Sequence, residues 1–167
     1  DDVLPYFKRA EHNERGTDAY HGSGGPLNVM DLRSPHRFGP IFVDAARQAG
    51  HAVNRDFNGA TQEGFGLYQV THKNGERFSA AKAYLVPNLA RANLRVVTEA
   101  QTTRVVLEGR RAVGVEVRIA GAPAQVLRAR REVLLAAGAL QSPQLLMLSG
   151  IGSGAQLQAH GIAVAHD

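Results

Sequence analysis

Cysteine is absent from the 167-residue sequence. Its absence excludes a disulfide framework and every metal site that is built on thiolates. Long apolar runs are missing as well, so the sequence predicts no transmembrane segment. The first residues, Asp1-Asp2-Val3, lack the basic and apolar regions of a signal peptide, and we expect a cytoplasmic location.

The net charge of +4 comes largely from scattered arginines, and residues 128–131 form their densest cluster. Two interpretations of this cluster compete: a solvated entry to the apolar run that follows, and a contact to phosphate or nucleic acid. No aromatic platform or recognition helix accompanies the arginines, which favours the first interpretation and no nucleic-acid partner. With 44% hydrophobic and 20% charged residues, the composition is that of one globular domain or two half-domains.

Residue patterns for acid–base, nucleophilic or metal chemistry are lacking. The seven histidines stand beside Gly, Pro, Asn or charged residues or near a terminus, which predicts solvated loop positions for His12, His21, His36, His51, His72, His160 and His166. Ser23, in a glycine-rich stretch, has no strand before it and no helix after it, so neither a nucleophile elbow nor a dinucleotide fingerprint is predicted. The sequence therefore predicts no catalytic residue and no metal site.

Helix and turn signals dominate residues 1–92. The spacing of apolar residues predicts a helix over 38–49 that ends at Gly50 and turns its apolar face to the core. Asn74-Gly75 predicts a hairpin turn, and Ser79 and Pro87 predict the start and end of a short helix. The remaining signals predict a helical or irregular lead-in over 3–15, a loop over 17–26, a short strand from 27, a turn at 56–59 and a strand over 64–71.

Strand signals dominate residues 93–167. The apolar run 133–137 predicts a central strand that is covered on both faces, as in a parallel sheet. After it, Gly138 turns the chain, Ser142-Pro143 begins a helix and Gly150 ends it. The fold class is α+β with an α/β part, divided near Asn93. The other expected strands are 94–98 and an antiparallel meander of 103–107, 112–119 and 125–127.

The turn Ala137-Gly138-Ala139 is the strongest candidate for a binding site. Ligands in open α/β sheets bind beyond the carboxyl ends of the strands, and small residues there let a ligand approach the backbone. The competing interpretation is a strand-to-helix joint that needs small residues for packing. The residues alone leave both interpretations open.

A long motif around this turn resembles a known family. Gly138-Ala139, Ser142-Pro143, Leu145-Leu146 and Ser149-Gly150-Ile151-Gly152 have the order and spacing of the second signature of the glucose–methanol–choline (GMC) flavoprotein oxidoreductases. The likeness extends over nearly the whole chain and is strongest to the choline dehydrogenase branch. The family's glycine-rich FAD fingerprint and its C-terminal catalytic histidine have no counterpart, so we expect an internal segment of a longer protein. Other stretches that agree in order are 3–9, 21–27, 56–59, 62–66, 73–75, 79–81, 83–85 and 112–116.

The resemblance implies an FAD-dependent enzyme that oxidises a primary alcohol, as choline dehydrogenase does, by hydride transfer to the flavin. Residues 1–92 would belong to its substrate-binding domain and residues 93–167 to its FAD-binding domain. The turn Ala137-Gly138-Ala139 would lie near the FAD, and the backbone of Thr102, where the family usually has valine, would contact the adenine. The parent's alcohol, its electron acceptor and any membrane association stay open.

We expect the isolated segment to be inactive and to hold no FAD. Its apolar run 133–137 would be an association site if nothing covers it, so self-association is expected. Glu63 has two interpretations, a partner for a cationic substrate such as a quaternary ammonium and a solvated turn carboxylate, of which the second is favoured. The alternative to a segment of an enzyme is a non-catalytic binding or interaction module of the same ancestry.

Overall fold

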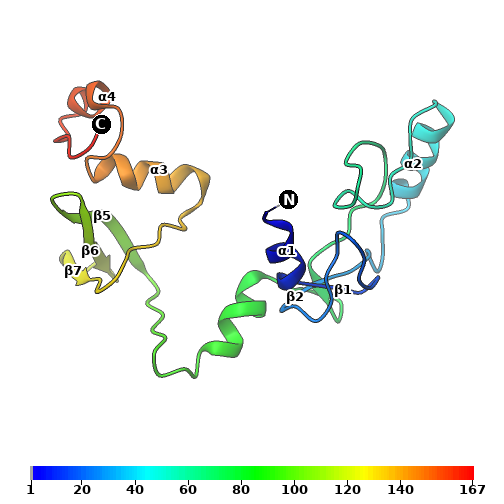
Figure 1. Cartoon of the computed structure of the whole chain (residues 1–167), viewed down its shortest axis with the longest axis horizontal. Helices are drawn as coiled ribbons and strands as arrows, with labels where there is room; N and C mark the ends of the chain where they lie inside the picture. The colour runs from blue at the N-terminus through cyan, green and yellow to red at the C-terminus, as the bar shows by residue number, and fades with distance from the viewer. Residues whose placement is uncertain (1) are drawn as a thin grey trace. The chain divides into compact units, whose positions relative to one another are not determined.

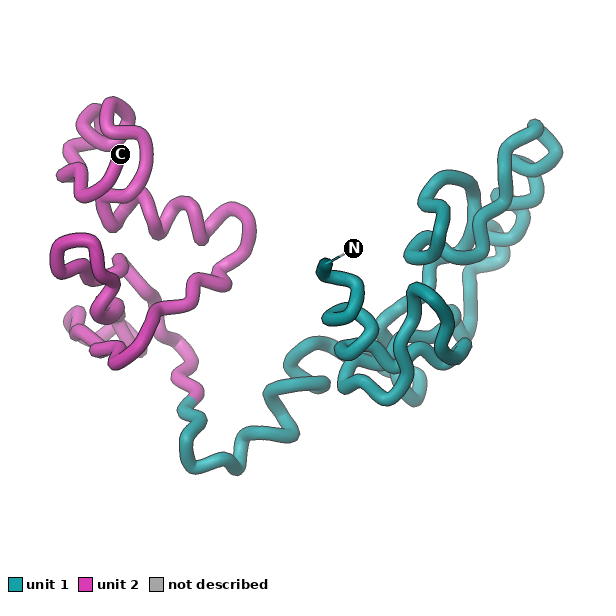
Figure 2. The backbone as a smooth tube through the Cα atoms, in the orientation of Figure 1, with its two compact units in different colours: residues 1–95 teal, residues 96–167 magenta. Residues whose placement is uncertain are grey.

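The computed structural model describes residues 2–167, which form two compact units (Figure 2). Unit 1 ends at Arg95 and unit 2 runs from Val96 to Asp167, so the division lies close to the predicted boundary near Asn93. The assignment of the two halves to a substrate-binding and an FAD-binding part stays a prediction. None of the helices in residues 2–167 has the length and apolar character that a bilayer crossing requires.

Unit 1 combines short helices with two small sheets (Figure 1). Strands β1 and β2 pair in parallel, although they are close in the sequence, and β3 and β4 form an antiparallel hairpin. Asn74 and Gly75 both have positive φ, 53° and 81°, as a two-residue turn of type I′ requires, which confirms the predicted hairpin. The elements are α1 (Leu4–Ala10), β1 (Glu11–Asn13), β2 (Leu27–Val29), α2 (Phe38–Gln48), β3 (His72–Lys73), β4 (Glu76–Arg77), a π-helical turn (Ala81–Leu85) and a 3-10 turn (Val86–Asn88).

The helix α2 has the predicted bounds but not the predicted burial. Gly50 has φ +89°, and the N–H of His51 bonds to the Ala46 carbonyl at 3.0 Å, which is the glycine stop that the sequence indicates. The apolar face was expected in the core, and this was wrong: Ala46 is buried, but Phe38, Ile41 and Phe42 are 57–64% exposed. An amphipathic pattern shows which face of a helix can be buried. Burial itself needs a surface to pack against, and the neighbouring loop offers little beyond the Phe65 ring, which contacts Phe42.

Two predicted strands do not form. Residues 64–71 make only isolated bridges, Val53 to Phe65 and Met30 to Val70, and residues 94–98 pair with none of the described residues. The glycines explain the first difference, because a Cβ on Gly66 would lie 1.8 Å from the Asn54 carbonyl oxygen. The glycines at 64 and 66 allow this backbone to lie close to the backbone of residues 52–54, and they do not extend a strand ladder.

Unit 2 is built on the predicted meander, which the structure confirms. Strands β5 (Ala100–Glu108), β6 (Arg111–Ile119) and β7 (Gln125–Arg128) form one antiparallel sheet in the order β5-β6-β7. Val113 and Val117 alternate along β6 and are buried, as a half-buried strand requires. Together with Val105, Leu145 and Leu157 they form the small apolar core of this unit.

The helix after the turn begins earlier than the sequence predicts. Helix α3 spans Gly138–Leu148, so Pro143 lies inside it, and Ser142 accepts a hydrogen bond from the Ala137 N–H at 3.0 Å. Pro143 is the sixth residue of α3 and lacks an N–H, so the helix loses one backbone hydrogen bond there. The stop at Gly150 is confirmed: its φ is +84° and the N–H of Ile151 bonds to the Leu146 carbonyl at 3.0 Å. A second helix, α4 (Gly154–Ala159), follows.

The run 133–137 is not the buried central strand that the sequence predicts. It makes no ladder with any described residue, and Leu134 is 80% exposed. A strand needs a neighbour for its backbone hydrogen bonds, and an apolar run cannot supply that neighbour. The prediction of an apolar segment at 133–137 is confirmed, but the prediction that it pairs as a central strand was wrong.

Ser149 joins α3 to the edge of the meander. Its Oγ accepts a hydrogen bond from the Val105 N–H at 2.8 Å and donates one to the Leu145 carbonyl at 2.6 Å. Val105 and Leu145 are both buried, so water is a poor substitute for the hydroxyl. The serine thus satisfies a backbone donor on β5, which has no second neighbouring strand among the described residues.

Replacing Ser149 tests this joint. Ser149→Ala leaves the Val105 N–H unsatisfied, and the free energy of unfolding of unit 2 should fall by about 1–3 kcal/mol. Urea denaturation followed by circular dichroism measures the loss. Ser153→Ala is the matched control, because Ser153 is exposed and its side chain caps nothing; its effect should stay below about 0.5 kcal/mol. Equal effects of the two substitutions would refute the role of Ser149.

Candidate functional site

Unit 2 contains an open cavity of about 1070 Å³. Its walls are the start of β5, the middle of β6, the end of β7, the extended segment 132–137 and one side of α3. Of the predicted site residues, Thr102 and Ala137 both line it, although 35 residues separate them in the sequence. Gly138 and Ala139 follow directly in the chain but do not line the cavity.

The lining suits binding better than catalysis. Apolar side chains (Val115, Leu127, Val133, Leu135 and Leu145) alternate with the amides of Gln101, Gln141 and Gln144. Small-molecule sites combine these two features, since apolar walls take up a ring system and a few polar groups fix its orientation. Among the described residues of the lining there is no histidine, serine or cysteine that could act with a neighbouring base. The charged groups of the lining are the carboxylates of Glu99 and Glu132 and the guanidinium of Arg128.

Thr102 lies near the start of β5, opposite Val117 of β6. Because β5 is an edge strand of this sheet, part of its backbone faces away from β6 and is free for a ligand. A register shift follows directly, between Thr102 and Arg104, and the Thr103 hydroxyl bonds to Glu116 at 2.7 Å. The register shift lies directly beside Thr102, and the ladder continues beyond it from Thr102 to Ala100, the part of β5 that lines the cavity.

Gly138 has φ +91°, a region that other residues rarely adopt. An added Cβ at this position would have no atom within 4 Å. The glycine is therefore needed for the conformation of the turn, and close contact with other parts of this chain is not the reason. Ala137 and Gln141, which flank the first turn of α3, both line the cavity, so the turn sets the direction in which the helix leaves it.

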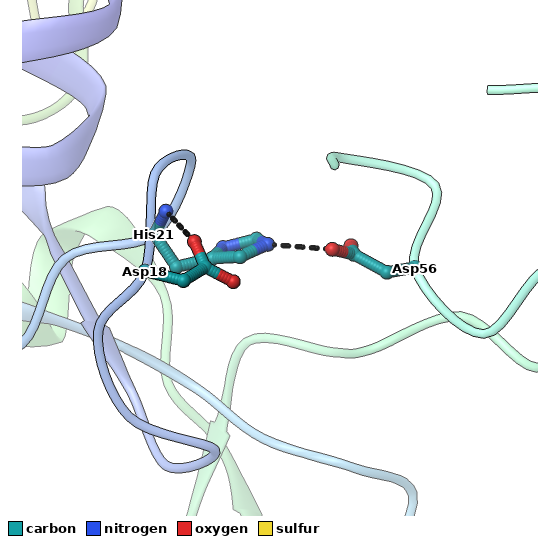
Figure 3. A group of neighbouring side chains, drawn as sticks. All are labelled: Asp18, His21 and Asp56. Carbon is teal, nitrogen blue, oxygen red and sulfur yellow. Dashed lines mark hydrogen bonds and ion pairs between the residues drawn. The ribbon is translucent and has the colours of Figure 1, made fainter. Parts of the chain in front are cut away.

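A second cluster, in unit 1, corrects the prediction that all histidines are solvated. His21 is only 6% exposed. Its Nδ1 lies 3.1 Å from Glu11 Oε2. Its Nε2 lies 2.9 Å from Asp56 Oδ2, the contact that Figure 3 shows. Asp18, from the same loop as His21, accepts the N–H groups of Tyr20 and His21, each at 2.7 Å. The spacing Asp-x-x-His is a local signal of this turn, but nothing in the sequence indicates the partner 35 residues away.

Burial and hydrogen bonding act in opposite directions on His21. Burial disfavours the charged ring, but the hydrogen bonds to Asp56 and Glu11 and the negative charges of both carboxylates outweigh it and raise the pKa of His21 above its ordinary value. Ligand atoms of Asp18, His21 and Asp56 lie within 4.8 Å of one another, a spacing that a metal ion could bridge. Both ring nitrogens already face carboxylates, however, so protons account for the arrangement without a metal.

Glu63 lies exposed in a loop of unit 1, as expected of a solvated turn carboxylate. Its backbone carbonyl accepts a hydrogen bond from the Asn54 side chain at 3.1 Å. Glu63 lines neither of two cavities of unit 1, one beside Arg15 and Leu67 and the other beside His12 and Lys73. The geometry therefore gives no support to a contact between Glu63 and a cationic substrate.

Comparison with known sequences decides the family. The family model described as GMC oxidoreductase matches residues 1–162, nearly the whole chain. This chain belongs to the GMC oxidoreductase family. The resemblance read from the motif at residues 138–152 is thereby confirmed.

Curated relatives of this GMC chain include an oxygen-dependent choline dehydrogenase of Brucella anthropi, 49% identical over 166 residues, and an alcohol dehydrogenase [acceptor] of Pseudomonas putida, 47% identical over 163 residues. The matches cover 99% and 96% of this chain but 30% of each relative. The chain thus spans less than a third of the length of these relatives.

A solved structure has the same fold. Pyridoxine 4-oxidase from Mesorbium loti matches 100% of this GMC chain and 33% of its own chain, with a TM-score of 0.88 and 32% sequence identity. The predicted fold class, α+β with an α/β part, agrees with this likeness and is confirmed. The positions of Thr102, Ala137, Gly138 and Ala139 relative to a cofactor stay a prediction.

The conformation of Gly138 can be tested by two substitutions of different size. Gly138→Ala and Gly138→Val should each lower the free energy of unfolding by about 1–3 kcal/mol through backbone strain. Because an added side chain meets no atom, the two losses should be similar. Urea denaturation measures both. A loss within error of zero would show that the turn tolerates a side chain, and a loss that grows steeply with size would indicate a clash instead of strain.

Proposed function

We propose that this chain is part of an FAD-dependent GMC alcohol dehydrogenase and that the cavity of unit 2 forms part of its flavin site. The observation that carries the proposal is that Thr102 and Ala137 line the same cavity. The motif and the adenine contact of the resembled family had suggested these two residues separately. Their place in one cavity supports a single binding site.

The lining residues fit the chemistry of such a cofactor. Val115, Leu127 and Leu135 provide apolar walls for a flat ring, and the free backbone edge of β5 at Thr102 can donate and accept hydrogen bonds to its polar rim. Gln141 and Gln144 of α3 add two further amides. When bound, FAD would supply the hydride acceptor for alcohol oxidation. The chain's own residues would orient the cofactor and exclude water on one side.

For the whole protein we propose a primary alcohol as substrate. The relatives named as choline and alcohol dehydrogenases support this class. The catalytic base would come from parts of the protein outside this segment, since no histidine lines the cavity. We also propose that the isolated segment self-associates, because the apolar side chains of Leu134 and Leu140 are 80% and 87% exposed.

Filling the cavity in the full-length protein tests the proposal. Ala137→Phe should weaken FAD binding by about tenfold to a hundredfold, because the ring overpacks the site. Thr102→Val is the matched control and should leave FAD content unchanged, because the proposed contact runs through the backbone. Flavin absorbance per protein and alcohol oxidation measure the effect. A full-length protein that is free of flavin would favour a non-catalytic module, and unchanged FAD binding by Ala137→Phe would remove the cavity from the flavin site.

The isolated 167-residue chain should neither hold FAD nor oxidise choline or another alcohol. Dinucleotide affinity in such folds comes mostly from a pyrophosphate at a helix N-terminus behind a glycine-rich turn, and the sequence has no such arrangement after a strand. Purified chain should be colourless, and added FAD should keep its free fluorescence. A yellow preparation with stoichiometric flavin would show that the segment alone builds a complete site.

A further inference from the structure

The proposed flavin site leaves one group of titratable side chains, gathered around the buried His21, without a role. We define the His21 cluster as Glu11, Asp18, His21 and Asp56. All four belong to unit 1, whereas the residues of the proposed flavin site belong to unit 2. An inference about this cluster therefore stands or falls independently of the proposed function.

Counting donors and acceptors assigns the protons of the His21 ring. The Asn13 amide nitrogen lies 3.1 Å from each of Glu11 Oε1, Gln69 Oε1 and His21 Nδ1. Its two hydrogens bond to the two oxygens, because Gln69 returns a hydrogen bond to Asn13 Oδ1 at 3.2 Å and hydrogen bonds to an ionised carboxylate are stronger than those to a neutral ring nitrogen. The His21 Nδ1 is thus left to donate to Glu11, because an ionised carboxylate only accepts. The same reasoning makes Nε2 a donor to Asp56. Both ring nitrogens carry a proton, and the ring is an imidazolium.

This ring connects three segments of unit 1. Glu11 belongs to β1, His21 to the loop at 17–26, and Asp56 to the turn at 56–59. Two bonds reinforce the side toward β1, since Glu11 also accepts the Gly22 N–H at 3.0 Å and the Asn13 amide. The only bond of the cluster to the turn is the one between His21 and Asp56.

We propose that His21 is a pH-operated clasp: its doubly protonated ring holds the turn at residues 56–59 against β1 and releases the turn when one ring proton is lost. A neutral ring would present a lone pair to one of two carboxylates, so that two acceptors face each other. The Asp56 side opens first, because Asp56 is more exposed than Glu11 and has fewer bonds to the cluster.

The charges around the ring favour its protonated state. Glu11 faces it from β1, Asp56 from the turn and Asp18 from its own loop. The cation facing the group is Lys8 of α1, whose Nζ bonds to the backbone carbonyls of Asp18 and Ala19 at 2.5 and 3.2 Å. Three carboxylates against one ammonium leave a negative surrounding that an imidazolium neutralises in part.

The direction of the pH effect follows from linkage. The pKa of His21 in the folded chain is raised above its ordinary value of 6.5, because the bonds to Asp56 and Glu11 outweigh burial. The contribution of the clasp is therefore fully present below about pH 6.5 and is lost as the pH rises through the folded-state pKa. The turn should be held at mildly acidic pH and mobile at alkaline pH.

Trypsin cleavage after Arg55 reports on the turn in the full 167-residue chain. The Arg55 carbonyl accepts a hydrogen bond from Arg15 at 2.8 Å in the closed state. Cleavage at Arg55 relative to the exposed Arg91 should rise several-fold between about pH 6.5 and about pH 9. Asp56→Asn is the matched control, because its amide can donate to a neutral Nε2 and its oxygen can still accept the Asn58 N–H. In this variant the cleavage ratio should be independent of pH.

Two further measurements keep the inference falsifiable if the variant folds poorly. Nitrogen NMR of the ring in the unaltered chain should show both His21 nitrogens protonated at mildly acidic pH, with a titration midpoint above the ordinary histidine value of 6.5. A midpoint at or below 6.5, or equal pH dependence of cleavage in the unaltered chain and Asp56→Asn, would overturn the clasp. So would stoichiometric Zn²⁺ binding that Asp56→Asn abolishes, since the cluster would then be a metal site.

Discussion

The buried His21 connects three segments of unit 1 through its contacts with Glu11 and Asp56. The buried hydrophobic residues of this unit are two alanines, Ala46 and Ala83, whereas Asn13, His21 and Asn28 are buried polar residues. Apolar burial therefore contributes little to this unit, and a hydrogen-bonded network holds β1, the loop at 17–26 and the turn at 56–59 together. No buried side-chain polar atom among the described residues lacks a partner, as such a network requires.

Unit 2 follows a different principle. Val105, Val113, Val117, Leu145 and Leu157 form an apolar core between the meander and the two helices, and Ser149 attaches α3 to the sheet edge. The segment 133–137 and the start of α3 lie outside this core and expose large apolar side chains. Such surfaces are costly in water, and in a chain that spans 30% of its relatives they are natural places for further parts of a GMC protein to pack.

The two units contain different kinds of chemical groups, and this difference bears on function. The cavity of unit 2 combines apolar walls with amide groups, whereas the titratable cluster of unit 1 is occupied by its own hydrogen bonds. In the proposed GMC enzyme, this segment would position a cofactor and shape its surroundings.

The sequence by itself determined the features that depend on neighbouring residues. The type I′ turn at Asn74-Gly75, the glycine stops at Gly50 and Gly150, the alternation along β6 and the family motif were all predicted, because conformational preference is a local property. Only the tertiary structure decided what meets across long separations. It left the apolar run 133–137 and the face of α2 without partners, brought Thr102 to Ala137, and buried His21 between Glu11 and Asp56. Whether a residue is buried, and which strand or side chain it pairs with, depends on surfaces from distant parts of the chain. A local sequence pattern indicates that a segment can pair but does not determine its partner.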